Sequence, residues 1–182
     1  MIEPVDLGIC RGYEYQGDPA RTAIVMPGRM LGGMPVNAFA IEAVWKQGWR
    51  AILVWDELLD ESQDMTGWIR ARLSAAAAYA GDEGERLVIG KSLGTLAAGA
   101  AAERGWRAVW LTPLLNHPPF VEMLRARTAP ALLIGGTKDP AWDGGLAREL
   151  SDDVLELDGA DHGLARIEDL RPVVDRITAF LH

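Results

Sequence analysis

Short apolar runs alternate along this chain with longer segments of helix-forming residues, and this alternation strongly limits the folds that the chain can adopt. Most of the runs are continuous rather than alternating in polarity, which is typical of strands that are buried on both faces. Strands of this kind, separated by helices, predict a doubly wound, mostly parallel α/β sheet with helices on both faces. The predicted strands lie at residues 22–26, 51–55, 87–89, 108–111, 131–134 and 153–157.

The segments between these runs predict the helices and the turns that separate them. Residues 5–15 alternate in part and predict one or two further strands, while a turn is expected at 17–19 and a proline-rich loop at 112–120. No internal repeat, linker or low-complexity segment interrupts the pattern, so we expect one domain over residues 1–182. Helices are expected at residues 36–47, 65–80, 95–102, 121–127, 145–150 and 167–181.

Charge and cysteine usage exclude several classes of protein. The net charge is −8, from 26 acidic and 18 basic residues, which argues against nucleic acid or an anionic membrane as the main partner. The single cysteine, Cys10, excludes an intrachain disulfide and lies in an apolar run, so a buried structural thiol is expected. The first residues lack the pattern of a signal peptide, and no apolar run approaches the length of a membrane span. We therefore expect a cytoplasmic protein.

Ser92 lies between a predicted strand and a predicted helix, with Gly90 and Gly94 two residues away on either side. A turn this sharp forces the serine into a strained backbone conformation and lifts its hydroxyl clear of the sheet edge. Side chains at 90 and 94 would collide with the neighbouring strand and helix, and the free N–H groups of the following helix would stabilise negative charge. The alternative is a glycine-rich turn whose serine caps the helix. A phosphate-binding loop is excluded because position 85, where that motif needs glycine, is Glu.

Two more reactive residues follow predicted strands. Asp139 comes after the strand at 131–134, and His162 comes after the strand at 153–157. Ligands bind at the carboxyl ends of the strands in an open parallel sheet, so these loops are where chemistry is expected.

Each of these residues has an alternative. Asp139 could be a turn residue before Pro140, and Asp161 is a rival acid that is better explained as a turn residue. His117 is a rival base, interpreted as a loop residue near the pocket because it precedes the acid in the chain. Lys91 is expected at the surface or in an ion pair.

The order Ser, Asp, His, carried by GKSLG, GGTKDP and DGADHG, resembles the α/β-hydrolase superfamily across nearly the whole chain. The resemblance implies acyl transfer to Ser92, with His162 as general base and Asp139 as the acid that orients it. It also implies an oxyanion hole, for which the backbone N–H of Leu93 and that of Arg29 are the candidates. Gly28 or Met30 could replace Arg29 as the second donor.

The resemblance also directs attention to the walls of a pocket. Only about eighteen residues separate the strands at 108–111 and 131–134, so a large cap cannot be accommodated and an open site is expected. Apolar residues near the same sheet edge suggest a site for an apolar acyl or alcohol group, although each of them could simply pack the loops. The candidate substrate-binding residues are Gly28, Met30, Leu31, Met34, Trp55, Leu114, Phe120 and Trp142.

Taken together, the resemblance implies a serine hydrolase, a carboxylesterase that acts on a small-molecule ester. A thioesterase is the nearest alternative, and a dienelactone-hydrolase-like enzyme is another, in which Arg29 would pair with a substrate carboxylate. The nucleophile of that enzyme is a cysteine, whereas position 92 is a serine. A non-catalytic binding module on the same fold is the alternative of a different class. No metal or organic cofactor is implied, and the oligomeric state is not indicated.

Overall fold

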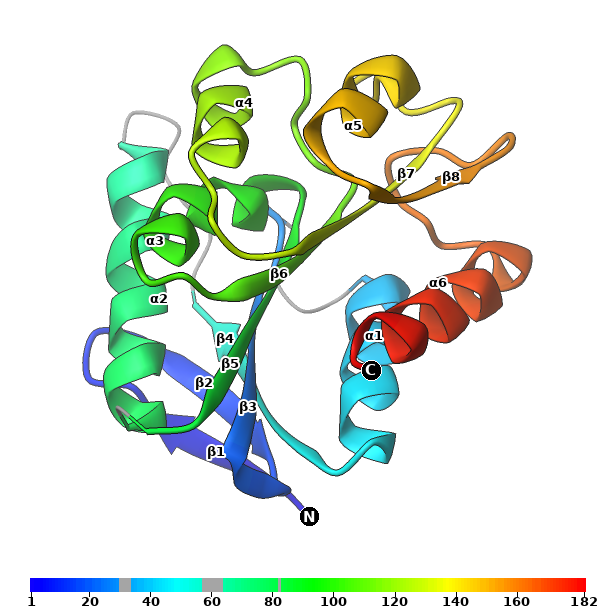
Figure 1. Ribbon diagram of the computed structural model, residues 1–182. Helices are drawn as coiled ribbons and strands as arrows, with labels where there is room; N and C mark the ends of the chain where they lie inside the picture. The colour runs from blue at the N-terminus through cyan, green and yellow to red at the C-terminus, as the bar shows by residue number, and fades with distance from the viewer. Residues whose placement is uncertain (30–33, 57–63, 82) are drawn as a thin grey trace.

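The computed structural model describes residues 1–29, 34–56, 64–81 and 83–182. Within these residues, eight strands form one sheet in the order β1-β2-β4-β3-β5-β6-β7-β8 (Figure 1). The six strands from β3 to β8 pair in parallel, and the β1–β2 hairpin extends the sheet with antiparallel pairing to β4. The strands are β1 (Ile2–Asp6), β2 (Arg11–Tyr15), β3 (Asp18–Met26), β4 (Trp49–Trp55), β5 (Glu85–Lys91), β6 (Arg107–Leu111), β7 (Ala131–Gly136) and β8 (Asp153–Leu157).

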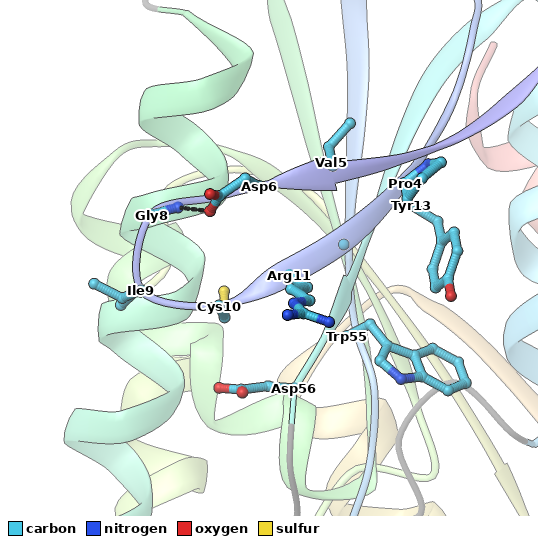
Figure 2. Close-up of a pocket in the computed structure, with 11 residues that line it drawn as sticks. Pro4, Val5, Asp6, Gly8, Ile9, Cys10, Arg11, Tyr13, Trp55 and Asp56 are labelled. Carbon is cyan, nitrogen blue, oxygen red and sulfur yellow. Dashed lines mark hydrogen bonds between the residues drawn. The ribbon is translucent and has the colours of Figure 1, made fainter.

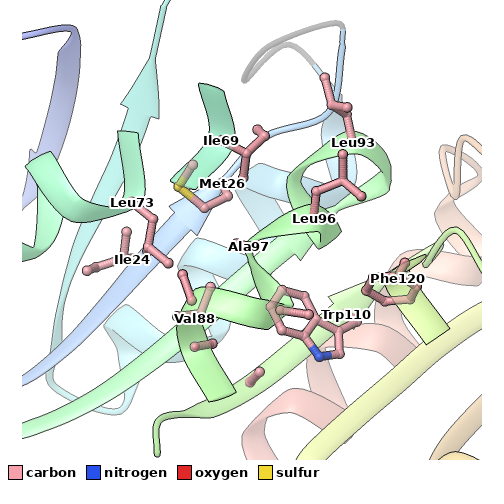
Figure 3. Packing of buried hydrophobic residues seen from close by; sticks show 14 of the residues in the cluster. Ile24, Met26, Ile69, Leu73, Val88, Leu93, Leu96, Ala97, Trp110 and Phe120 are labelled. Carbon is pink, nitrogen blue, oxygen red and sulfur yellow. The ribbon is translucent and has the colours of Figure 1, made fainter. Parts of the chain in front are cut away.

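Helices cover both faces of the sheet, as the apolar runs predicted. Alternate residues of a strand point to opposite faces, so Ile24 and Met26 enter one apolar cluster while Ala23 and Val25 enter another. All four are fully buried. The first cluster, part of which Figure 3 shows, lies under α2 (Met65–Ala80), the 3-10 helix η1 (Ser92–Ala97), α3 (Ala98–Glu103), α4 (Pro118–Arg125) and α5 (Gly144–Leu150). The second lies under α1 (Pro35–Lys46) and α6 (Ile167–Phe180) (Figure 1).

Two of the predicted boundaries were wrong. The turn expected at 17–19 is the start of β3, since Asp18 pairs with Trp49 before the register shifts at Thr22. The proline-rich loop expected at 112–120 gives way to α4 at Pro118, because proline lacks only an N–H that the first helical turn leaves unbonded. The connection between β6 and β7 therefore holds one helix of eight residues and no cap domain.

The N-terminal hairpin buries the single cysteine. Cys10 is 8% exposed, and burial, together with the Asp56 carboxylate, raises the pKa of its thiol. The prediction of a buried thiol is thus confirmed, and a raised pKa disfavours the reactive thiolate. Over the part of the chain that the structure describes, none of the helices has both the length and the apolar composition that crossing a bilayer requires.

Candidate active site

Ser92 lies at the sharp turn between β5 and η1. Its backbone φ is 52°, a conformation that residues other than glycine rarely adopt. The Thr95 hydroxyl donates a hydrogen bond of 2.6 Å to the Ser92 carbonyl and so helps to hold the turn. Strain of this kind persists only where the surrounding structure enforces it, and it is concentrated at functional sites.

The glycines on either side of Ser92 are required by close contacts. A Cβ atom on Gly90 would lie 2.6 Å from the Gly94 carbonyl oxygen and 2.6 Å from the Trp110 ring. A Cβ atom on Gly94 would overlap the carbonyl group of Met26 on the neighbouring strand β3. Main-chain atoms cannot move aside as a flexible side chain can, so the turn strongly favours glycine at position 94.

Replacing Gly94 by alanine is expected to destabilise the protein by about 3 kcal/mol or more, because the added methyl group forces β3 and η1 apart. Denaturant unfolding followed by circular dichroism measures the change. Gly99→Ala is the matched control, since its Cβ would meet only the flexible Met123 side chain, at 3.3 Å. Equal stability of the two variants would contradict the explanation given for Gly94.

The helix after Ser92 differs from the expected one. An α-helix was predicted from residue 95, but the chain forms the 3-10 helix η1 first and becomes α-helical only over Ala98–Glu103. The tighter winding accompanies the close approach of Gly94 to β3. The leading N–H groups of a helix have no acceptor within it, and Leu93 is the second residue of η1. Its N–H is therefore suited to bind an oxyanion beside Ser92.

His162 bridges the other two reactive residues. Its Nε2 lies 2.7 Å from Ser92 Oγ, and its Nδ1 lies 2.8 Å from Asp139 Oδ2. An ionised carboxylate can only accept, so the nitrogen that faces Asp139 carries the proton and Nε2 is left to accept from the serine hydroxyl. The Asp139 side chain is fully buried, whereas that of His162 is 36% exposed. This arrangement can remove a proton from Ser92.

Asp139 is both a turn residue and the acid that contacts His162. Its Oδ1 accepts a hydrogen bond of 2.8 Å from the N–H of Ala141, which leaves Oδ2 for the imidazole. The rival acid, Asp161, is exposed and accepts from the N–H of Gly163 at 2.8 Å, as a turn residue does. The rival base, His117, precedes the first residue of α4, and its carbonyl accepts from the N–H groups of that helix.

Lys91 was expected at the surface or in an ion pair; it is buried, so the surface position was wrong. It is 5% exposed, and its Nζ donates to the backbone carbonyl of His162 at 2.9 Å. Burial lowers the pKa of Lys91 to about 8, although the carboxylates of Asp139 and Asp161 act in the opposite direction. The pattern of β5 carried a signal that we missed, because Lys91 occupies the same alternate positions as the buried residues Leu87 and Ile89.

The loop after β3 lies against the serine. Gly28 is buried, and a Cβ atom on it would lie 3.2 Å from Ser92 Cβ and 3.2 Å from the Lys91 carbonyl oxygen. The exposed Arg29 follows directly. The main chain at 28–29 therefore passes beside the nucleophile, where a second oxyanion donor is needed. Met30 and Leu31 lie outside the described residues, so their substrate-binding role stays a prediction.

Trp55 lines a cavity that the serine does not line. It is 36% exposed, packs edge-to-face on Tyr13, and lines a cavity of about 930 Å³ beside the β1–β2 hairpin (Figure 2). Cys10, Arg11 and Asp56 line the same cavity, whereas Ser92, Asp139 and His162 do not. Trp55 therefore lies beside the β1–β2 hairpin.

The other apolar candidates divide between core and sheet edge. Phe120 is fully buried against Trp110, so its expected place in a pocket wall was wrong. Trp142 lies across Gly135 of β7, and its Nε1 donates to Glu156 Oε2 at 2.7 Å. Two more candidates are partly buried at this edge: Leu114 packs against the first apolar cluster, and the Met34 side chain lies beside the loop of His162 at Gly163.

Comparisons with known proteins identify the fold. No protein-family model matches the sequence, and no curated protein matches it. The structure is similar to an alpha-beta serine hydrolase homologue from Coxiella burnetii, with a TM-score of 0.76 and 13% identity over 100% of this chain and 97% of that one. It is also similar to dienelactone hydrolase from Anabaena variabilis, with a TM-score of 0.77 and 18% identity over 100% and 95% of the two chains.

A third similar structure is the esterase domain of a Rhodothermus marinus protein, with a TM-score of 0.75 and 16% identity over 99% of this chain and 97% of that one. These likenesses extend over nearly the whole length of both chains. The chain therefore has the α/β-hydrolase fold, which confirms the predicted fold class.

Proposed function

We propose that the protein is a serine hydrolase that cleaves a small carboxylic ester by acyl transfer to Ser92. The observation that carries the proposal is the unbroken path of hydrogen bonds from Ser92 Oγ through the His162 ring to the buried carboxylate of Asp139, at 2.7 Å and 2.8 Å. A turn that merely capped a helix would need neither the imidazole nor the carboxylate. Hydrolases and an esterase domain among the similar structures support the same reaction class.

Each residue has a defined part in the proposed reaction. Ser92 Oγ attacks the ester carbonyl carbon while His162 Nε2 takes the hydroxyl proton, and Asp139 stabilises the imidazolium that forms. His162 then gives this proton to the leaving alcohol, and in the second half of the cycle it activates a water molecule that releases the acid. The backbone N–H groups of Leu93 and Arg29 are proposed to bind the tetrahedral oxyanion, a contact whose loss typically raises the barrier by about 2.7–4 kcal/mol.

The surroundings of Ser92 suit a small substrate. A Cβ atom on Gly28 would lie 3.2 Å from Ser92 Cβ, so the loop after β3 passes close to the serine, and the connection after β6 adds no cap domain. Met34 and Leu114 are partly buried at the same edge and are proposed to contact the acyl or alcohol group. Trp55 and Trp142 stay weaker candidates, because the first lines the hairpin cavity and the second is held by Glu156.

Labelling with a fluorophosphonate probe tests the proposal directly. Such probes react with a serine whose hydroxyl is activated by a base, so Ser92 is expected to be labelled in the folded protein. Ser92→Ala should abolish the labelling. Ser74→Ala is the control, because Ser74 lies on α2, where its hydroxyl accepts from Arg104 at 3.1 Å. Absence of labelling in folded wild-type protein would favour a non-catalytic binding module on this fold.

A substrate panel separates the alternatives within the class. Matched acyl oxoesters and thioesters, varied in chain length and charge, distinguish an esterase from a thioesterase. A preference for substrates with a free carboxylate would favour a dienelactone-hydrolase-like enzyme, with Arg29 beside the site as the pairing residue. Our proposal expects the fastest turnover with short, uncharged oxoesters.

A further inference from the structure

Lys91 carries an ammonium group that is buried in the site and that the proposed reaction does not use. The residue lies at the end of β5, directly before Ser92, and is 5% exposed. Taking an ammonium group out of water is unfavourable unless it finds polar partners. Lys91 Nζ finds one in the carbonyl oxygen of His162, at 2.9 Å. A buried cation is thus bonded to the main chain of the very residue that contacts the serine.

We propose that Lys91 is a positioning residue, whose ammonium group holds the loop after β8 so that the His162 imidazole stays within hydrogen-bonding distance of Ser92. The inference rests on the proposed function, since it gives Lys91 a part in the same reaction. Lys91 acts through the main chain alone, because the two ring nitrogens of His162 are occupied by Asp139 and Ser92.

The loop that carries His162 is anchored on both sides but exposed in the middle. Ala160 and Leu164 are fully buried, and the Ala160 carbonyl accepts from the N–H of Lys138 at 2.9 Å. Between these anchors, Asp161 is exposed and the His162 side chain is 36% exposed. The bond from Lys91 reaches the loop at this exposed part, so it restrains the residue that the two anchors hold least.

The stem of Lys91 also supports the loop after β3. A Cβ atom on Gly28 would lie 3.3 Å from Lys91 Cδ, so the stem passes close to Gly28. One side chain therefore lies close to the loop proposed to bind the oxyanion and donates a hydrogen bond to the loop that holds the base. Misplacing a catalytic group by about 1 Å can lower a rate about a hundredfold, so a contact that sets both positions has a large effect.

The charge of Lys91 depends on the loops around it. Asp139 after β7 and Asp161 after β8 favour the ammonium form, and burial opposes it more strongly, so the pKa of Lys91 lies at about 8. Arg29 follows Gly28 on the loop after β3, and the first turn of α1 carries no acidic residue. Above pH 8 a neutral amine replaces the ammonium group, and it is a weaker donor to the His162 carbonyl.

Stability and activity should respond to this titration in opposite directions. The ordinary pKa of the side chain is 10.5, so between about pH 8 and 10.5 the unfolded chain holds a proton that the folded protein has lost. The Lys91 contribution to the free energy of unfolding therefore rises with pH in this range. The proposal expects activity to fall in the same pH range while this contribution to stability rises. General alkaline unfolding would instead lower activity and stability together.

Kinetics of Lys91→Met and Lys91→Arg test the inference. The methionine variant keeps an apolar stem and removes the charge, and we expect kcat to fall by about tenfold to a hundredfold with little change in KM. The decline of wild-type kcat as pH rises through about 8 should be absent from this variant. Lys91→Arg keeps its charge above pH 8 and should recover part of the loss. Lys46→Met, the same change at an exposed lysine on α1, is expected to match the wild type.

The possible outcomes separate this inference from the proposed function. If Lys91→Met folds with wild-type kcat and the same alkaline decline, the role of Lys91 is overturned. If that variant does not fold, a wild-type kcat that stays constant through pH 8 in folded protein overturns it instead. Fluorophosphonate labelling gives the second comparison: an unlabelled wild type contradicts the proposed function, whereas equal labelling rates in the wild type and Lys91→Met contradict only the positioning role.

Discussion

Replacing Ser92 with alanine is expected to lower kcat for ester hydrolysis by about 10⁴- to 10⁶-fold, as loss of the nucleophile does in serine hydrolases. Without the hydroxyl, His162 Nε2 has no proton to take, although its 2.8 Å bond to Asp139 remains. The fold should be retained, because alanine removes one oxygen atom and keeps the same Cβ at a φ of 52°.

Steady-state turnover of a short oxoester, with unfolding followed in parallel, measures this effect. Ser74→Ala serves as the control, since it removes a hydroxyl from α2 and leaves the turn at Ser92 intact. A Ser92→Ala protein that kept most of the wild-type rate would show that the esterase activity resides elsewhere, or came from a contaminant.

Asp139→Asn should produce the second largest effect, a fall in kcat of about 10⁴-fold. The N–H of Ala141 holds Oδ1 at 2.8 Å, so an amide placed here keeps its oxygen at that donor and turns its NH₂ group toward His162 Nδ1. The imidazole must then accept at Nδ1 and carry its proton on Nε2, where it can no longer take one from Ser92.

The matched control for this prediction is Asp161→Asn, which makes the same change on the loop after the neighbouring strand β8. Asp161 is exposed and accepts only a local bond from the N–H of Gly163, which an asparagine oxygen can replace. At pH 7, where Lys91 is still mostly protonated, the kcat of Asp161→Asn is expected to stay within about threefold of the wild type, since a single exposed charge has a small effect. Equal losses in the two variants would argue that charge near the site, and not the tautomer of His162, controls the rate.

The architecture could be predicted because helices cover the sheet on both sides. A strand such as β3 must then be apolar at successive positions, and Val25 and Met26 are fully buried on opposite faces. Runs of this kind are visible without coordinates, and so are the loops that follow them. The order of Ser92, Asp139 and His162 after their strands follows from the same reasoning, and the structure brings the three within hydrogen-bonding distance. Their catalytic roles stay predictions until the variants are measured.

Side-chain environments were less predictable, because they depend on loops that are distant in the chain. Lys91 lies close to the loops of Gly28 and His162, and its partner is the main-chain carbonyl of His162. Every residue has such a carbonyl, so the sequence does not indicate which one binds the lysine. Phe120 seemed available to a pocket only while α4 was expected to begin after it. Trp142 was expected to line the pocket, but its indole N–H donates to Glu156 on the neighbouring strand β8, a partner that the sequence does not indicate.

The position of β8 at the end of the strand order has a consequence for how the site can be switched off. Ser92 follows β5, which is paired on both sides, whereas His162 follows an edge strand that is paired only with β7 in the described sheet. Edge elements open locally at a lower free energy than central ones. Heat, denaturant or a competing strand that opens β8 would move the His162 imidazole away from Ser92 first. The central strands would stay folded with Ser92 in place, but the proposed general base would be missing.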